Sequence, residues 1–391
     1  MKNKKALSFT ILMIATLQMG GMGLAPSLAA IQADMPNVPT SIVQTITSFP
    51  SFVMIFVCIL AAKLSERISK KSILLFGVTA ISAVGLLGYF FNSSIVLLYV
   101  WAGLLGVGFG TILPACSGII AENYDEQGRR GIMGIQSVFT NIGAMYLTYV
   151  GGALAVMNWH LNYLVYLYGL ISLICGLLFL PNDKPNRAQV QTEKVKISSL
   201  NPKTWIYGAF TFLFLICFGV YSANIAFFVM ETGIGNPATI GTIMAVCTIG
   251  GMVGGATFNP VAGKFGNYTF SAAYVMMIIG LLLTANANTL IVAYIGAIFV
   301  GVSISWTIPQ TMLSLTNCNT VAAATLACSV GHIGGQLGTF VSSLIMTPIT
   351  GLFSDTTVFR YVFTAGLCAV LAVVSAIVVA KMDRKMPQAS R

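Results

Sequence analysis

Twelve long apolar runs follow one another along this 391-residue chain, and few charged residues interrupt them. Each run has about 20 residues or more, the length that a helix needs to cross the roughly 30 Å hydrocarbon layer of a bilayer. Backbone groups in lipid must bond within their own segment, so we expect transmembrane helices. The predicted spans are residues 6–33, 40–62, 72–91, 95–120, 131–155, 161–181, 204–230, 238–262, 269–287, 290–316, 322–349 and 359–380.

The composition excludes a water-soluble domain. Hydrophobic residues make up 57% of the chain and charged residues only 8%, against about 25% charged in soluble domains. A transmembrane β-barrel is excluded because its strands would alternate apolar and polar residues, whereas runs such as 204–230 are continuous. The sequence therefore predicts an all-α membrane protein.

The basic residues lie almost entirely on one side of the predicted spans. Nineteen of the 20 lysines and arginines fall in the termini and in alternate loops, and Arg360 falls on the other side. Because cytoplasmic loops carry the Lys and Arg excess, both termini are expected in the cytoplasm. Topology and anionic lipid account for the net charge of +10, so we expect no nucleic-acid partner.

The chain divides into two similar halves. A polar stretch separates six spans from six spans, so we predict an N-terminal six-helix bundle at 1–181, a cytoplasmic linker at 182–203 and a C-terminal six-helix bundle at 204–391. Several residues recur at a nearly constant spacing, as Gly106 does at Gly301, 195 positions later. Two parallel repeats of this kind place a substrate site near the bilayer midplane.

The loop after the second span carries the most specific pattern in the sequence. Residues 62–71 read Ala-Lys-Leu-Ser-Glu-Arg-Ile-Ser-Lys-Lys. This order resembles the corresponding loop of the major facilitator superfamily, although both glycines of the family pattern are replaced here. The resemblance implies a cytoplasmic gate in which charged side chains bond to neighbouring helix ends; a plain basic anchor for the loop is the alternative. The gating candidates are Glu66, Arg67, Lys70 and Lys71.

The resemblance extends over the whole chain and implies a fold and an activity. The implied fold has twelve transmembrane helices in two six-helix bundles related by pseudo-twofold symmetry. The implied activity is secondary active transport of a small organic solute by alternating access. We expect proton-linked efflux across a bacterial inner (cell) membrane. An uptake symporter or uniporter for a neutral nutrient, such as a sugar, nucleoside or amino acid, is the alternative, and a channel or sensor is less favoured.

No pattern in the sequence predicts an enzyme. G-x-S-x-G, H-E-x-x-H and the nucleotide-binding G-x-x-x-x-G-K-[ST] are absent from the sequence. The eight cysteines are scattered singly, without the spacing of a metal or redox site. We therefore expect no cofactor and no metal, and a monomer whose partners are the solute, protons and membrane lipid.

Polar and amphipathic side chains near the span centres are candidates to bind the solute. Aromatic rings with neutral amides suit an uncharged or weakly charged organic molecule. We expect no buried Arg or Lys, which disfavours sugar-phosphate and dicarboxylate substrates. Each residue alone could instead bond neighbouring helices to each other. The substrate-binding candidates are Gln18, Gln136, Asn141, Tyr146, Tyr221, Asn224, Trp306, Gln310 and Gln336.

Three ionisable residues are candidates for ion coupling. Asp34 and Glu231 lie at the outer ends of spans 1 and 7, at positions 197 residues apart; both could instead be solvated loop acids. His332 lies near a span centre, and histidine titrates near pH 6.5, about where protons exchange in cells. It could also be a neutral histidine bonded across helices. Gln336 follows one helical turn later, so both side chains could face one cavity.

Glycines and prolines predict close contacts and breaks in the spans. Glycines four residues apart, such as Gly106 and Gly110, let helices approach closely, either within one bundle or where two bundles slide. The fifth span keeps only part of a glycine pattern of antiporters of the family, at Gly143 and residues 151–152. Prolines inside spans should kink or loosen them. These prolines are Pro26, Pro50, Pro114 and Pro309.

Overall fold

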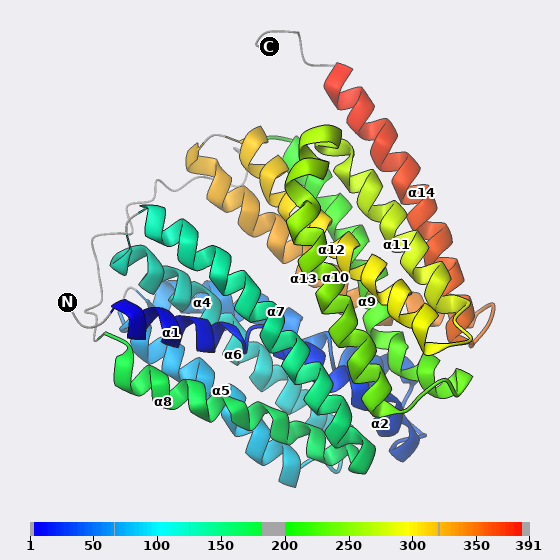
Figure 1. The fold of residues 1–391 in the computed structure, drawn as a ribbon, viewed down its shortest axis with the longest axis horizontal. Helices are drawn as coiled ribbons and strands as arrows, with labels where there is room; N and C mark the ends of the chain where they lie inside the picture. The colour runs from blue at the N-terminus through cyan, green and yellow to red at the C-terminus, as the bar shows by residue number, and fades with distance from the viewer. Residues whose placement is uncertain (1–3, 66, 125, 182–199, 320, 385–391) are drawn as a thin grey trace. The chain divides into compact units, whose positions relative to one another are not determined.

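A computed structural model of the chain describes residues 4–65, 67–124, 126–181, 200–319 and 321–384. These residues form helices joined by short turns, and no strand occurs among them (Figure 1). A helical stretch corresponds to each of the twelve predicted spans.

The first six spans break into more pieces than the sequence predicted. They comprise α1 (Lys4–Ala15), the 3₁₀ helix η1 (Gly20–Ser27), α2 (Leu28–Asp34), α3 (Thr40–Thr45), α4 (Phe49–Leu64), α5 (Lys70–Phe90), α6 (Ile95–Asn123), α7 (Glu126–Met157), the 3₁₀ helix η2 (Trp159–Tyr168) and α8 (Gly169–Phe179).

The last six spans are longer and less broken. They comprise α9 (Lys203–Thr232), α10 (Pro237–Phe265), the short 3₁₀ helix η4 (Gly266–Tyr268), α11 (Thr269–Ala285), α12 (Leu290–Cys318), α13 (Val321–Gly351) and α14 (Thr357–Arg384).

Length and composition alone mark nine stretches of the described chain as able to cross a membrane. The 49-residue stretch Pro237–Ala285 counts once there although it holds two predicted spans, and Phe49–Ala61 counts as a shorter apolar helix. α13 is long enough but more polar, because it carries His332 and Gln336. These three differences account for the gap between nine stretches and twelve spans.

Several helices begin at side-chain caps that the sequence supplies. The Ser69 hydroxyl accepts a hydrogen bond from the Ser72 amide at 3.2 Å, where α5 begins. Before α10, the Thr239 amide donates to Asn236 Oδ1 at 3.1 Å, and the Asn236 amide donates to Thr239 Oγ1 at 3.2 Å. Such caps satisfy amides that have no partner inside the helix.

The prolines affect the spans in two ways. Pro26 lies inside η1, where the first span has left the α-helical form, as predicted. Pro50 lies in the first turn of α4, so it starts a helix after a break in span 2 instead of kinking one. Pro114 and Pro309 lie inside the continuous helices α6 and α12.

Contacts group the chain into two compact units. The first holds residues 1–192 and 225–245, and the second holds residues 193–224 and 246–391. Most of the predicted linker at 182–203 lies outside the described residues, so its bounds stay a prediction.

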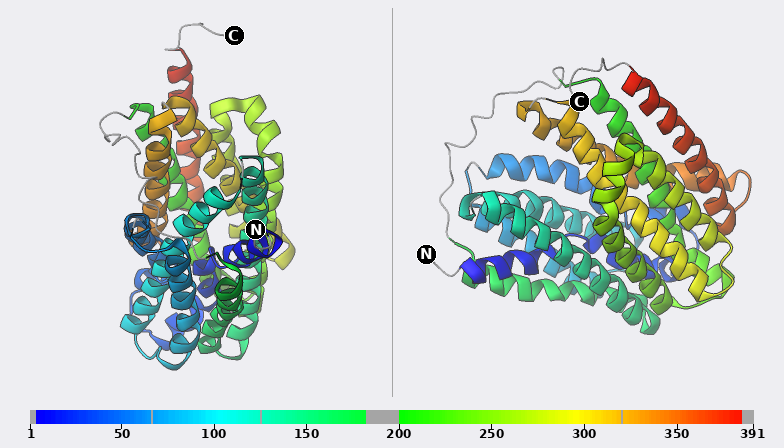
Figure 2. Two further views of the ribbon diagram at one scale, coloured as in Figure 1. Left: turned by 90° about the vertical axis from the view of Figure 1, so that its left-hand side faces the viewer. Right: turned by 45° about the horizontal axis from the view of Figure 1, so that its top comes forward.

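The first unit is held together by closely approaching helices. α6 packs against α4 and α5, α7 packs against η1 and η2, and α1 lies beside α8 (Figures 1 and 2). A Cβ on Gly106 would lie 2.6 Å from the Pro50 carbonyl oxygen, and one on Gly110 would lie 2.7 Å from the Val57 Cβ. These glycines therefore serve close packing within one unit.

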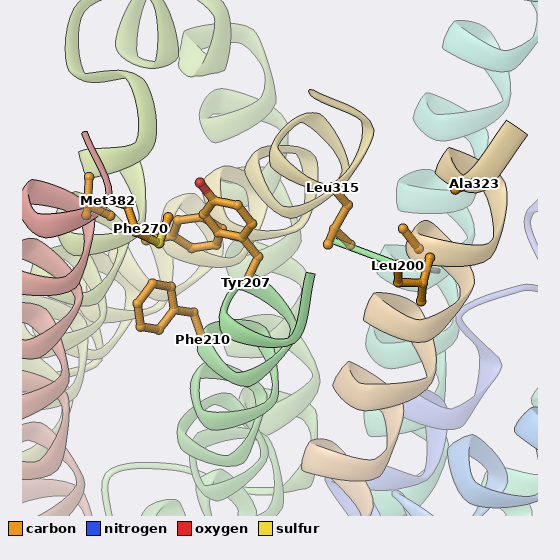
Figure 3. Close-up of a cluster of buried hydrophobic side chains, with 9 residues drawn as sticks. Leu200, Tyr207, Phe210, Phe270, Leu315, Ala323 and Met382 are labelled. Atoms are coloured by element: carbon orange, nitrogen blue, oxygen red, sulfur yellow. The ribbon is translucent and has the colours of Figure 1, made fainter. Parts of the chain in front are cut away.

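The second unit repeats that packing. α11 lies against α12 and α14, which Figures 1 and 2 also show. A Cβ on Gly301 would lie 1.9 Å from the Cys247 carbonyl oxygen, so α12 approaches α10 as α6 approaches α4. An aromatic cluster joins α9 to α11, with ring centroids of Tyr207 and Phe210 at 5.8 Å and 5.6 Å from that of Phe270 (Figure 3).

Candidate functional site

A group of polar side chains lies on the first unit where α1, α7 and η2 meet. The Thr140 hydroxyl of α7 lies 3.4 Å from Gln18 Oε1, and the Thr16 hydroxyl lies 3.2 Å from that of Tyr168. The ring of Tyr146 lies 5.2 Å from that of Tyr168, at an interplanar angle of 48°. We name these five residues, Thr16, Gln18, Thr140, Tyr146 and Tyr168, the mid-span polar cluster.

A glycine permits the approach that forms the mid-span polar cluster. A Cβ on Gly143 would lie 1.9 Å from the carbonyl oxygen of Thr16, far inside van der Waals contact. The backbone of span 1 at Thr16 therefore lies directly against α7 at Gly143. Gly143 is three residues after Thr140 and three before Tyr146. The partial glycine pattern of the fifth span thus shapes the cluster.

The Gln18 side chain has unused hydrogen-bonding capacity. Its Nε2 is buried and has no hydrogen-bond partner among the described residues. Tyr146 is 39% exposed, while Gln18, Thr140 and Tyr168 are half-buried. A buried amide donor beside partly open phenol rings can bind an acceptor atom of a small molecule.

Two further candidates lie on α7 beside this cluster. Gln136 is half-buried, and its carbonyl oxygen accepts the Thr140 hydroxyl at 2.9 Å. Asn141 is half-buried and directly follows Thr140. Gln18 and Tyr146 therefore belong to the cluster, Gln136 contacts it through its carbonyl oxygen, and Asn141 lies on the same helix.

In the second unit, two candidate residues bond to neighbouring segments. Trp306 Nε1 of α12 donates to the Gly254 carbonyl oxygen at 3.1 Å and to Thr257 Oγ1 at 3.2 Å. Gln310 Nε2 donates to Asn267 Oδ1 at 3.3 Å, in the turn between α10 and α11. Both side chains are buried, and these bonds tie α12 to α10 and to that turn.

The remaining candidates on α9 face α14. Asn224 Oδ1 accepts a hydrogen bond from Arg360 Nη1 at 3.0 Å, and the Tyr361 hydroxyl donates to the Tyr221 carbonyl oxygen at 3.4 Å. Arg360 is only 6% exposed, which corrects the expectation that no Arg is buried. Arg360 is the fourth residue of α14, so it lies in the first turn of that helix.

Of the candidates for ion coupling, His332 lies on α13 with Gln336 at its side. The Nε2 atoms of the two side chains are 3.4 Å apart, which confirms that they share a helix face. The His332 side chain is exposed. An exposed imidazole beside an amide can gain and lose a proton without breaking a buried bond.

The two outer acids have different surroundings. Asp34 Oδ2 accepts a short hydrogen bond from Trp159 Nε1, and the Trp159 ring lies 3.8 Å from that of His160. Asp34 therefore joins the end of α2 to the start of η2. Glu231 is exposed near the end of α9.

The loop after α4 is described except for Glu66, which lies outside the described residues. Lys71 Nζ donates to the carbonyl oxygens of Leu177 and Leu180, at 3.2 Å and 2.9 Å, and so caps the end of α8. Lys70 is half-buried against Gly118 of α6, and Arg67 is exposed. Two of the four gating candidates thus contact neighbouring helices.

Sequence reasoning missed three members of the mid-span polar cluster, Thr16, Thr140 and Tyr168. Threonine and tyrosine are common in these spans, and the chain has 14 tyrosines, so residue type alone gave no signal. Among the described residues, no three His, Cys, Asp or Glu side chains come together as a metal site would require.

Solved transporter structures resemble the chain over its whole length. The nucleoside transporter NupG has 13% identity and a TM-score of 0.76, covering 95% of this chain and 98% of that one. The POT family transporter PepTSo has 11% identity and a TM-score of 0.74, covering 99% and 100%. A bacterial homolog of the human lysosomal transporter Spinster has 13% identity and a TM-score of 0.73, covering 98% and 97%. At such identities the likeness shows the fold. No curated protein sequence matches the chain.

These likenesses show the fold of the chain, which has twelve transmembrane helices in two six-helix bundles. The family model of the Major Facilitator Superfamily matches residues 9–342. The chain therefore belongs to the Major Facilitator Superfamily: it is a multi-pass membrane transporter of small solutes, and not an enzyme.

Proposed function

We propose that this protein carries an uncharged, polar organic solute by alternating access, and that the solute binds the mid-span polar cluster. The buried Nε2 of Gln18, which has no partner among the described residues, is the observation that carries the proposal. Tyr146 and Tyr168 add aromatic faces 5.2 Å apart, against which an apolar part of the solute can pack.

The charge of the cluster supports an uncharged solute. Its five members are neutral amides, hydroxyls and phenols. Binding a phosphate or carboxylate in a membrane requires a cationic partner, since an unpaired buried charge is costly. The buried guanidinium of Arg360 is not a member of the cluster, because it lies in the second unit and donates to Asn224.

We also propose proton-linked export across a bacterial inner membrane, with both termini in the cytoplasm and the chain acting as a monomer. The exposed His332 beside Gln336 supports the proton link, and the placement of 19 of 20 basic residues supports the orientation. Uptake of a neutral nutrient is the second candidate. The likeness to the structure of the nucleoside transporter NupG favours it.

The test begins with thermal shifts of the purified protein in the presence of uridine and of glucose, two uncharged polar solutes. A bound solute stabilises the folded state by mass action, whatever the direction of transport. Counterflow in proteoliposomes then measures exchange of each radiolabelled probe. We expect the wild type to exchange at least one of these uncharged probes, and not glucose 6-phosphate.

A matched pair of variants on α7 locates the site. Tyr146→Leu should raise the half-saturating concentration about tenfold, as expected when roughly 1.4 kcal/mol of binding is lost. Tyr149→Leu is the control, because Tyr149 is 56% exposed and lies outside the cluster on the same helix. Equal half-saturating concentrations for the two variants, or preferred exchange of glucose 6-phosphate, would contradict the proposal.

A further inference from the structure

The outer half of span 1 has an unusual backbone. After α1, residues 20–27 form the 3₁₀ helix η1, although 3₁₀ runs longer than about four residues are uncommon. The change begins just before Gln18. The amides of Leu17 and Gln18 donate to the carbonyl oxygens three residues earlier, each at 3.1 Å, and so leave the α-helical pattern. Gln18 therefore lies at the junction between the two helix forms.

Two side chains of η2 bond directly to the backbone of η1. The Tyr166 hydroxyl donates to the Gly20 carbonyl oxygen at 2.6 Å. Asn162 Nδ2 donates to the Gly23 carbonyl oxygen at 2.9 Å, and its distance to Ser27 Oγ is 2.5 Å. Asn162 and Tyr166 are fully buried, so water does not compete for these bonds.

Close packing around η1 leaves little room for a different backbone path. A Cβ on Gly20 would lie 2.7 Å from the Phe109 ring, and one on Gly23 would lie 3.1 Å from the Tyr166 hydroxyl oxygen. A Cβ on Gly151 of α7 would lie 2.5 Å from Asn162 Oδ1. A Cβ on Gly151 would also lie 2.9 Å from the Gly23 carbonyl oxygen, so α7 approaches the backbone of η1, and side chains of η2 pack against both.

The helix form of η1 decides where Gln18 points relative to the outer part of the span. A 3₁₀ helix rises about 2.0 Å and turns about 120° per residue, against about 1.5 Å and 100° in an α-helix. Over eight residues the two forms differ by roughly 4 Å in length and roughly 160° in rotation. With the outer end of the span fixed, a return to the α form would move the Gln18 amide away from Thr140.

We propose that Asn162 and Tyr166 are positioning residues for solute binding: they hold η1 in its 3₁₀ form and so direct Gln18 into the mid-span polar cluster. This inference rests on the proposed function, because it assigns these residues to the same binding site. Neither residue touches the solute. Their hydrogen bonds select the backbone form in which the site is complete.

The first test measures the position of residue 18 without any solute. Gln18→Cys and Thr140→Cys are introduced together into the full chain and treated with a short bis-methanethiosulfonate cross-linker. Mass spectrometry of the peptides identifies the 18–140 link separately from the native cysteines. Adding Tyr166→Phe or Asn162→Leu should lower its yield about fivefold, because one or more of the bonds that hold η1 is lost.

The matched control is Tyr163→Phe. Tyr163 lies in the same 3₁₀ helix and is also fully buried, but its hydroxyl has no hydrogen-bond partner in the described part of the chain. This variant should keep the wild-type cross-linking yield. An undiminished yield in Tyr166→Phe, which removes a single oxygen atom and leaves the ring in place, would overturn the proposal.

The second test separates positioning from general stability. Tyr166→Phe should raise the half-saturating concentration of uridine or glucose, whichever the wild type exchanges, about fivefold while changing the maximal rate less than about twofold. A fall in maximal rate alone would overturn the positioning role. Exchange of neither probe by the wild type would count against the proposed function, and the cross-linking yields would still decide this inference by themselves.

Discussion

Gly143 is a position where a single carbon atom decides whether α7 can lie against span 1. A Cβ there would lie 1.9 Å from a carbonyl oxygen of the backbone, which cannot rotate aside as a side chain can. We expect Gly143→Ala to destabilise the protein by about 1–3 kcal/mol, the usual effect of overpacking. The thermal unfolding midpoint of the purified protein in detergent measures the effect.

Gly255 provides the matched control for this substitution. It lies within α10, and a Cβ there would meet nothing within 4 Å. Alanine favours a helix over glycine by up to about 1 kcal/mol, so Gly255→Ala should leave the midpoint unchanged or raise it. If Gly143→Ala unfolded at as high a temperature as Gly255→Ala, α7 and span 1 could move apart at position 143 without loss of stability.

At the residue scale, the sequence predicted part of the candidate site. Gln18 and Tyr146 were selected because they are polar or amphipathic side chains at mid-span, and the structure places both in one cluster. Tyr168 also lies within a predicted span, but the chain has 14 tyrosines and residue type alone did not single it out. Arg360 was placed by charge counting on the side opposite the other basic residues, and counting does not show that the fold buries its side chain.

Among the elements, the turn between α10 and α11 depends on one backbone conformation. Gly266 has φ of 54°, in the left-handed region that favours glycine. No atom lies within 4 Å of a Cβ at this position, so a substitution there has only a conformational cost. Gly266→Ala should cost about 1–2 kcal/mol, and Gly266→Asn less, because asparagine tolerates this region. The unfolding midpoints of both variants measure the difference.

Gly263 separates this effect from a general effect of added side chains. It lies within α10 three residues earlier, with nothing within 4 Å of a Cβ, and it is helical. Gly263→Ala should not lower the unfolding midpoint. Equal midpoints for the alanine and asparagine variants at position 266 would show that the left-handed backbone is not retained in solution.

The loop between α4 and α5 is the element in which the gating proposal is tested. Arg67 is exposed, so its replacement removes a charge without opening the core. We expect Arg67→Gln to slow exchange about tenfold, as the loss of one charge-assisted hydrogen bond at the gate would do, while leaving membrane insertion intact. Counterflow rates and the yield of inserted protein are the two measurements.

Lys63 is the control for this loop. It is an exposed basic residue in the last turn of α4, four positions before Arg67. Lys63→Gln also removes one positive charge, but Lys63 is not among the gating candidates that the family pattern implies. Equal rates in both variants would favour the alternative in which the loop only anchors the chain at the cytoplasmic side.

At the scale of elements, the sequence predicted which segments are helical better than where they break. Span length and apolarity follow from the thickness of a bilayer, so all twelve spans have helical counterparts. The 3₁₀ form in span 1 is held by tertiary bonds from Asn162 and Tyr166 to η1, which the sequence alone does not show. Local signals there are the glycines at 20, 21 and 23 and Pro26, and Pro50 marks the start of α4 in span 2.

At the scale of the whole molecule, the same pairs of spans are bonded in each half. In the first unit Asn162 bonds span 6 to Ser27 of span 1, and in the second Arg360 bonds span 12 to Asn224 of span 7. The paired positions are 198 and 197 residues apart, the spacing that the sequence repeat indicates. The bonded positions therefore follow the sequence repeat, although the residue types differ.

The two halves carry different side chains at some corresponding positions. His332 lies in α13, and position 134, which is 198 residues earlier, is a glycine. If His332 couples solute flux to protons, flux in proteoliposomes should change between about pH 5.5 and 8, where histidine titrates. A proton gradient should drive the solute in the direction opposite to proton flow. His332→Gln keeps a polar side chain of similar size and should flatten this profile while leaving counterflow at fixed pH intact.

His160 is the matched control, since the chain has two histidines. It lies in η2 at the outer end of span 6, with its ring against Trp159, and His160→Gln should keep the wild-type pH profile. A profile unaltered in His332→Gln would remove this residue from the coupling and leave Asp34 and Glu231 as the acids to replace next. Flux that ignores the proton gradient in the wild type would instead favour a uniporter or coupling to sodium.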